Sequence, residues 1–199
     1  MSVAIHTANR RLVFALCALL ACCASALGQD ELPEGRFEVV SAYPTERGGV
    51  YYVDAKILYE LPETADEALR SGVTLTLELQ IEVERLRRFP LPDKSVASLR
   101  QRYALQYHAL SDRYIVQNLN SGEQATYSTL EMAESSLGEV HELPVIDVAL
   151  LEPGVRHQLS MRAVLDIKRL PVPLRLFAFL FDDWRVTSQW YRWRFEREG

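Results

Sequence analysis

The chain has 199 residues, of which 25% are charged and 48% are hydrophobic, and its net charge is −5. This length suits a single domain after a short leader. An acidic chain is a poor electrostatic match for a polyanion, so the composition excludes a basic nucleic-acid-binding protein and no nucleic-acid partner is expected.

The first 26 residues have the features of a secretory signal peptide. Arg10 and Arg11 form a basic start, residues 12–23 carry no charge, and Ala24 and Ala26 supply small residues for cleavage. We expect cleavage after Ala26, which removes all three cysteines and leaves 20 basic against 27 acidic residues, a net charge of −7. A mature chain without cysteine has no disulfide, no thiol nucleophile and no thiolate metal ligand.

A lipoprotein signal is the alternative, because residues 19–22 (LLAC) resemble a lipobox and cleavage before Cys22 would leave that cysteine lipidated. Both leaders place the protein on the oxidising side of a membrane. We therefore expect a periplasmic protein, or alternatively a membrane-anchored lipoprotein, that contacts the membrane only through its leader or lipid anchor. Residues 27–35 are expected to form a flexible linker and residues 36–199 a single domain.

Alternation of apolar and polar residues predicts a β-rich domain. Residues 73–83 (VTLTLELQIEV) carry six apolar side chains at every second position, which predicts a long strand with one buried and one solvated face. A bulge is expected near Arg85, and Glu78, Glu82 and Glu84 are expected to be solvated. Further strands are predicted at residues 37–43, 51–59, 103–109, 114–119, 125–127 and 159–167, with turns at 111–112 and 120–122.

Two capping boxes predict short helices. Thr64 with Glu67 begins the first, and Ser128 with Glu131 begins the second, each followed by a glycine stop. Residues 176–181 are a short apolar run that is expected to form a buried strand or a loop touching a membrane. The expected fold is mainly β: an antiparallel β-sandwich of immunoglobulin-like outline with two short capped helices, after an N-terminal signal helix.

All three tryptophans fall in the final sixteen residues. The aromatic residues change parity along this segment, so either a bulge near position 190 rotates a strand or aromatic rings cover both of its faces. The rings could fill the core of a closing strand, or part of the group could be an exposed contact site, because Trp, Tyr and Arg dominate binding hot spots. The candidate binding patch is Trp184, Trp190, Tyr191, Arg192, Trp193 and Arg194.

The mature sequence shows no catalytic motif. His108, His141 and His157 lack metal-binding spacing, and His108 and His157 are expected to be solvated on strands. Asp182 and Asp183 are expected to lie in a capped turn rather than at a cation. We therefore expect no enzyme, catalytic residue, cofactor or metal, and a hydrolase using His108 or His157 is the minor alternative.

Four segments, in this order, resemble a known family: residues 107–114 (YHALSDRY), 121–133, 170–175 and 183–193. They resemble the proteobacterial exported family catalogued as domain of unknown function 4390, and the similarity runs from about Phe37 to about Phe195. The family has no established activity, so the resemblance transfers no catalytic residue. It implies an exported Gram-negative protein, encoded near a membrane sensor histidine kinase.

The expected function is a non-catalytic interaction module of the Gram-negative envelope, accessory to such a sensor kinase and of unknown oligomeric state. The alternative is a periplasmic glycan or small-ligand binder that uses the C-terminal Trp, Tyr and Arg cluster. Sugar rings stack on aromatic faces, and nearby arginines suit anionic groups.

Overall fold

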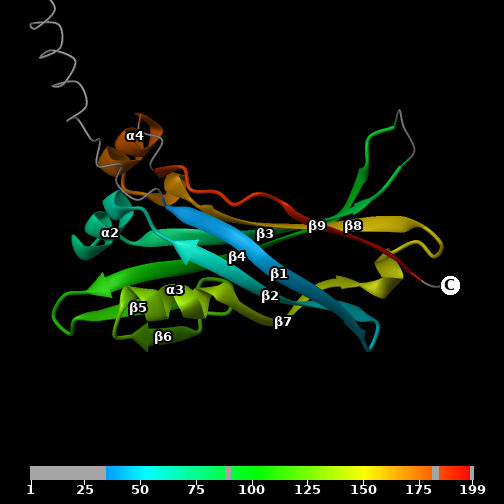
Figure 1. Cartoon of the computed structure of the whole chain (residues 1–199), viewed down its shortest axis with the longest axis horizontal. Coiled ribbons are helices and arrows are strands. Elements are labelled where there is room, and N and C mark those ends of the chain that lie inside the picture. Colours follow the sequence, from blue (N-terminus) through cyan, green and yellow to red (C-terminus); the bar gives the residue numbers. More distant parts are fainter. Residues whose placement is uncertain (1–34, 88–90, 181–183, 198–199) are drawn as a thin grey trace, which may run out of the picture. The chain divides into compact units, whose positions relative to one another are not determined.

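The computed structural model describes residues 35–87, 91–180 and 184–197, without the side chains of residues 177 and 179. The expected signal peptide, the lipid-acceptor position Cys22, most of the expected linker and the pair Asp182 and Asp183 lie outside the described residues. The described residues form two antiparallel sheets (Figure 1).

The smaller sheet has three strands in the order β1-β2-β7, and the larger has six in the order β6-β5-β4-β3-β8-β9. The smaller sheet consists of β1 (Arg36–Arg47), β2 (Val50–Glu60) and β7 (Glu139–Asp147). The larger sheet consists of β3 (Leu75–Arg85), β4 (Lys94–His108), β5 (Arg113–Asn118), β6 (Gln124–Tyr127), β8 (Arg156–Leu165) and β9 (Tyr191–Glu196).

The structure confirms the predicted fold class, which is mainly β with two antiparallel sheets. Both sheets contribute inward side chains to one hydrophobic core, including Phe37 and Val53 from the smaller sheet and Leu77 and Ile81 from the larger. Phe37 and Tyr59 meet edge to face, with ring centroids 4.9 Å apart. Strands β1 and β9 each have one neighbour among the described strands, so both lie at an edge of their sheet.

The alternation in residues 73–83 corresponds to β3, the central strand of the larger sheet. Leu75, Leu77 and Leu79 are fully buried, as expected for residues that face the core. The irregularity expected near Arg85 lies slightly earlier, where the pairing with β4 shifts between Val83 and Glu84. The apolar residues at every second position along β3 therefore form one side of the hydrophobic core.

Two strand regions were not predicted, namely β7 and the first half of β4. Strand β7 contains Pro144, which cannot donate a backbone hydrogen bond. Within the described part of the chain, this strand lies at the edge of its sheet and pairs with β2 alone. The two predicted turns are present: Asp112 and Gly122 adopt φ values of 51° and 82°, which short turns use to reverse the chain.

Both predicted helices form, but their caps differ from those expected. Helix α2 (Glu63–Arg70) has Pro62 at its N-cap and no side-chain cap, so Thr64 lies inside the helix instead of capping it. Helix α3 (Leu130–Gly138) is capped by Thr129, which accepts a hydrogen bond from the Met132 nitrogen, one residue after the expected Ser128. The helices were predicted correctly and the capping residues were not.

A third helix replaces the strand or loop expected at residues 176–181. Helix α4 (Val172–Leu180) begins after Pro171 and includes Pro173 in its first turn, where proline is tolerated because that nitrogen needs no helical partner. A short apolar run does not distinguish a buried strand from a helix, which explains the error. Among the described residues, no helix has the length and hydropathy needed to cross a membrane.

Candidate functional site

The C-terminal segment contains the predicted bulge. Thr187 forms an isolated bridge with Val164, and Tyr191 pairs with Met161, so a step of four residues in this segment spans a step of three in β8. One extra residue on one strand is a β-bulge, and it reverses which residues face inward. Before it, Ser188 is buried, and after it the odd-numbered residues of β9 face the core.

The six candidate residues therefore divide among three environments. Trp184 is 6% exposed and belongs to the core. Tyr191 and Trp193 are half-buried and pack against the core from β9. Arg192 and Arg194 are exposed on the other face of β9, and their side chains form no hydrogen bond or ion pair with the described part of the chain. The structure does not gather the six into one patch.

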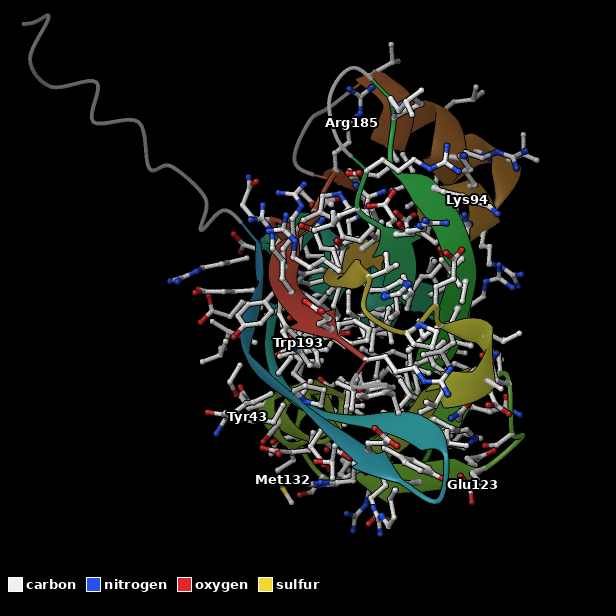
Figure 2. All side chains as sticks on the ribbon, turned by 90° about the vertical axis from the view of Figure 1, so that its right-hand side faces the viewer. Tyr43, Lys94, Glu123, Met132, Arg185 and Trp193 are labelled. Atoms are coloured by element: carbon white, nitrogen blue, oxygen red, sulfur yellow. The ribbon has the colours of Figure 1, made fainter. Side chains whose placement is uncertain are left out.

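The inward rings of β9 join the two sheets. The ring of Phe195 lies 6.0 Å from Trp193, 5.0 Å from Tyr51 on β2 and 5.8 Å from His157 on β8, between centroids. Figure 2 shows Trp193 on the inner side of β9, whereas Tyr43 lies at the outside of the molecule and is 66% exposed. Trp193 therefore serves mainly in packing.

Trp190 lies at the bulge and has a different partner. The Arg162 guanidinium carbon lies 4.3 Å from the centroid of the Trp190 ring, which is the geometry of a cation–π contact. Trp190 is half-buried, so its indole is held in place while part of it faces solvent.

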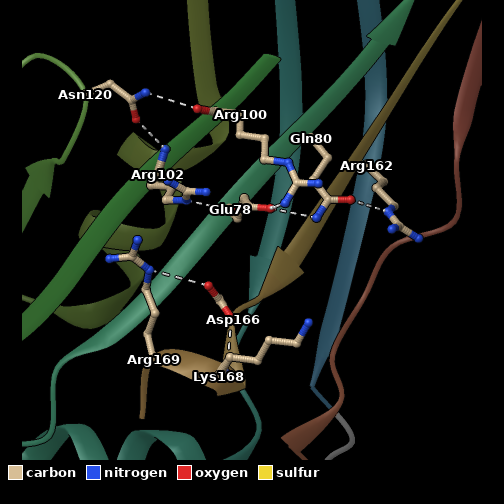
Figure 3. A network of polar contacts seen from close by, with 9 residues as sticks. All are labelled: Glu78, Gln80, Arg100, Arg102, Asn120, Arg162, Asp166, Lys168 and Arg169. Carbon is tan, nitrogen blue, oxygen red and sulfur yellow. Dashed lines mark hydrogen bonds and ion pairs between the residues drawn. The ribbon is translucent and has the colours of Figure 1, made fainter. Parts of the chain in front are cut away.

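A row of polar contacts across three strands of the larger sheet fixes Arg162 (Figure 3). The Arg162 Nε donates to Gln80 Oε1 at 2.8 Å, and Gln80 Nε2 donates to Glu78 Oε1 at 2.7 Å. On the far side, Arg102 Nε donates to Glu78 Oε2 at 2.7 Å, and Arg100 pairs with Glu78 at 3.4 Å. The row therefore runs from β4 through β3 to β8 and ends at the indole.

The expectation that Glu78 is solvated is wrong, because its side chain is only 5% exposed. Burial by itself raises the pKa of Glu78, but the hydrogen bonds from Arg102 and Gln80 and the positive charges of Arg100 and Arg102 outweigh it and lower the pKa below the ordinary value. The carboxylate stays ionised and anchors the row. Alternation placed Glu78 on the outer face, but the flanking arginines cover it there.

Trp190 forms one wall of a groove of about 300 Å³. Residues 36–39 of β1 form the opposite wall, and residues 189–191 complete the wall that contains Trp190. The groove therefore lies between an edge strand of the smaller sheet and the segment that leads into an edge strand of the larger. We take this groove, with Arg162 behind its indole, as the candidate functional site.

The sequence pattern does not indicate that Arg162, Gln80 or the β1 residues belong to this site. Arg162 and Gln80 were assigned to the polar faces of their strands, which is correct. Only the pairing of Gln80 with Arg162 across β3 and β8 brings them together. No spacing within a single strand could have indicated this contact.

His157 is buried, which corrects the expectation of a solvated residue. It is 1% exposed because it shares the inward parity of Leu159 on β8, and its Nδ1 has no hydrogen-bond partner. Burial lowers the pKa of His157, and the nearby Arg85 charge adds to this effect, while a backbone hydrogen bond to Val155 and the charge of Glu152 act in the opposite direction. Its burial also leaves it out of reach of a substrate in solution.

His108 is exposed, as predicted, at the end of β4, next to the turn that leads into β5. Its Nδ1 lies 2.8 Å from Ser111 Oγ, a contact that the sequence analysis did not identify although the two residues are three apart. Tyr107 donates to Asp112 Oδ1 at 2.7 Å in the same turn. Ser111 also donates to the His108 backbone oxygen, so these polar contacts close the turn. His141 is exposed beside Asp54, with 4.0 Å between their nearest atoms.

Within the ranges that the structure describes, no three His, Asp or Glu side chains are grouped closely enough to hold a metal ion. Asp182 and Asp183, which were considered as a cation site, are outside those ranges.

The described residues form a mainly β domain with an aromatic-walled groove at the edges of two sheets. The sequence profile of the family described as Domain of unknown function (DUF4390) matches residues 34–194, so the chain belongs to this family. The resemblance seen in the sequence segments is thereby confirmed. No curated protein and no solved structure matches the chain.

Proposed function

We propose that this protein is a non-catalytic interaction module that binds an extended segment of a partner protein in the groove between β1 and Trp190. The observation that carries the proposal is the position of a fixed, half-exposed indole opposite the edge of a sheet. These two features supply the two components that recognition of an extended peptide requires: backbone pairing and a side-chain anchor.

Strand β1 supplies the backbone component. Among the described residues it pairs only with β2, so no described strand uses the polar backbone groups on its other edge. An extended peptide that adds beside β1 can satisfy these groups and its own. Phe37 and Val39 face inward and anchor this part of β1 in the core, at 5% and 6% exposure. The template for pairing is therefore rigid.

Trp190 supplies the anchor. Large aromatic residues at the centre of an interface carry much of the binding energy, especially when they are ordered before binding. Arg162 holds the indole at 4.3 Å, and Gln80 and Glu78 hold Arg162. Little side-chain freedom remains to be lost when a partner binds.

The proposed location is the periplasm of a Gram-negative envelope, with a lipid-anchored form as the alternative. The basic start at Arg10 and Arg11, the uncharged residues 12–23 and the small residues at 24 and 26 support export. The proposed partner is a membrane sensor histidine kinase, to which the protein is accessory. The resemblance to the family supports this pairing, and the groove provides a physical means of contact.

Site-specific cross-linking tests the proposal. A photoreactive amino acid at the exposed groove residue Gln189 should capture a partner protein in intact cells, whereas the same group at exposed Gln106 on β4 should not. Trp190→Ala should reduce capture at least about tenfold. Tyr43→Ala, at an exposed aromatic residue outside the groove, is the matched control. Normal capture by a folded Trp190→Ala variant would show that the groove is not the contact site.

The second candidate is a glycan binder, because Trp190 and Tyr191 both line the groove and planar rings stack on sugars. Titration with cell-wall oligosaccharides should then change tryptophan fluorescence, and Trp190→Phe should remove most of the change. A flat titration with the wild-type chain would reject this candidate and leave the protein-binding proposal standing.

A further inference from the structure

Helix α4 exposes a continuous apolar stripe. Val172, Leu176 and Leu180 are 59%, 62% and 78% exposed. They are four residues apart, so they follow one another along the same side of the helix. Soluble proteins commonly expose single apolar side chains, but three in a row on one element mark a contact surface.

The opposite side of α4 holds the helix on the domain. Ala178 is fully buried and Leu174 packs against the hydrophobic core. At 100° per residue, these two lie across the helix from the exposed stripe. Arg175 is the only polar residue in the nine, and its guanidinium donates to the Lys168 backbone oxygen at 3.1 Å. The stripe is therefore presented on a helix that is fixed to the fold.

Basic residues flank this helix in the sequence on both sides, in a chain that is acidic as a whole. Lys168 and Arg169 are exposed just before it, and Arg185 is exposed just after it. The nearest described acidic residue in the sequence, Asp166, is paired with Arg169 at 3.6 Å. Residues 166–185 include four basic and three acidic residues, so this stretch has a positive net charge, whereas the net charge of the whole chain is −5. Figure 2 shows Arg185 on the same side of the molecule as α4.

The arrangement suits the surface of a bilayer better than its interior. Nine helical residues extend about 14 Å, less than half of a hydrocarbon core of about 30 Å, so α4 can lie in the interface but cannot span it. In Figure 1, β1 begins at the end of the sheets where α4 lies. In the lipid-anchored form, Cys22 precedes β1 in the chain, so the anchor would bring this end toward a membrane.

We propose that α4 docks side-on onto an anionic lipid surface, with Val172, Leu176 and Leu180 among the acyl chains and the flanking basic residues on the phosphate groups. The contact would attach the domain itself to the membrane, in addition to a lipid at Cys22 in the lipid-anchored form, and it is independent of the groove proposed to bind a partner. Apolar burial and attraction to anionic headgroups both contribute to such binding, so it should respond to both residue classes.

Vesicle co-sedimentation tests the docking. The exported and processed chain, carrying Cys22→Ser so that no lipid is attached there, is mixed with phosphatidylcholine vesicles that contain phosphatidylglycerol or lack it. We expect binding to the anionic vesicles, weaker binding to the neutral ones, and a loss of affinity of at least about tenfold for Leu176→Glu. Leu110→Glu, at a residue 97% exposed in the turn after β4, is the matched control and should bind like the wild type.

Lys168→Glu should weaken binding to the anionic vesicles only, since its contribution is electrostatic. Circular dichroism and urea denaturation verify that every variant is folded. Wild-type protein that stays in solution with both vesicle types would overturn the proposal, as would a folded Leu176→Glu variant that binds normally. A wild-type dimer that Leu176→Glu dissociates, without lipid binding, would assign the stripe to a second copy and would also overturn it.

Discussion

Glu134 on α3 makes the stability of this protein sensitive to pH near neutrality. Its side chain is half-buried and accepts a hydrogen bond from the Leu61 nitrogen at 3.0 Å. Burial raises the pKa of Glu134 to about 7; the Leu61 hydrogen bond opposes this effect, and the negative charges of Glu131, Asp66 and Glu60 add to it. The carboxyl group therefore changes charge under ordinary conditions.

The sign of the effect follows from linkage between protonation and folding. The folded protein binds this proton more tightly than the unfolded chain, so the stabilisation is complete below the unfolded pKa of 4.5 and is lost as pH rises through about 7. The difference between these pKa values corresponds to about 3 kcal/mol for a fully desolvated group. Because part of the Glu134 side chain is exposed to solvent, screening reduces the expected contribution to about 1–2 kcal/mol.

Glu134→Gln removes the charge and keeps an oxygen that can accept the hydrogen bond from Leu61. We expect its free energy of unfolding in urea to exceed that of the wild type by about 1–2 kcal/mol at about pH 8.5, and the difference to shrink toward pH 5. Glu131→Gln is the control on the same helix: it removes an exposed first-turn carboxylate whose pKa is lowered by hydrogen bonds to its own backbone nitrogen and to Thr129, so no gain is expected. A difference that is absent at high pH, or larger at pH 5, would refute the reasoning.

Three further changes test the packing and the candidate site. Gly138→Ala places a Cβ 2.1 Å from a backbone oxygen of β2, so we expect the free energy of unfolding in urea to fall by about 1–3 kcal/mol. Ser135→Ala, at an exposed position of the same helix, should leave it unchanged. An unchanged urea midpoint for Gly138→Ala would contradict the close approach. His157→Phe removes a buried nitrogen without a partner and should raise stability by about 1 kcal/mol, with a larger gain below pH 6.5, because the lowered pKa of His157 makes the wild type lose stability as pH falls. A variant whose thermal midpoint lies below that of the wild type at low pH would argue the opposite. Arg162→Ala should free Trp190 and shift tryptophan emission to longer wavelength, and an unchanged spectrum would show that the stacking does not hold the indole in solution.

The strands of the larger sheet could be predicted because one of their faces is buried. Alternation in β3 is complete over six apolar positions, and each such residue inside the strand is within 1% of full burial. Helices α2 and α3 could be located from their glycine stops and polar starts. The cap residues could not. Thr129 competes with its neighbour Ser128, which has a similar capping potential, and Pro62 stands at an N-cap that has no side-chain cap at all.

The errors have physical causes. Helix α4 is apolar on almost every side, so its sequence has no periodicity that separates a helix from a strand. Strand β7 contains a proline, and its pairing with β2 has two register irregularities, so its apolar and polar residues do not alternate regularly. A third irregularity lies where β2 pairs with β1. The candidate site depends on Gln80 and Arg162, which come from strands 82 positions apart. Sequence spacing alone contains no information on such a pairing.

The bulge before β9 determines which aromatic residues form the core and which form the groove. Without the extra residue, Trp190 would keep the inward parity of Ser188, and Tyr191 and Trp193 would point away from the core. With it, Tyr191 and Trp193 pack inward while Trp190 is displaced to the sheet edge, beside Arg162 and opposite β1. A single inserted residue thus closes the core and places an indole at the groove, since a bulge redirects every side chain that follows it. The uncertainty of the sequence pattern at this point and the location of the candidate site therefore have the same structural cause.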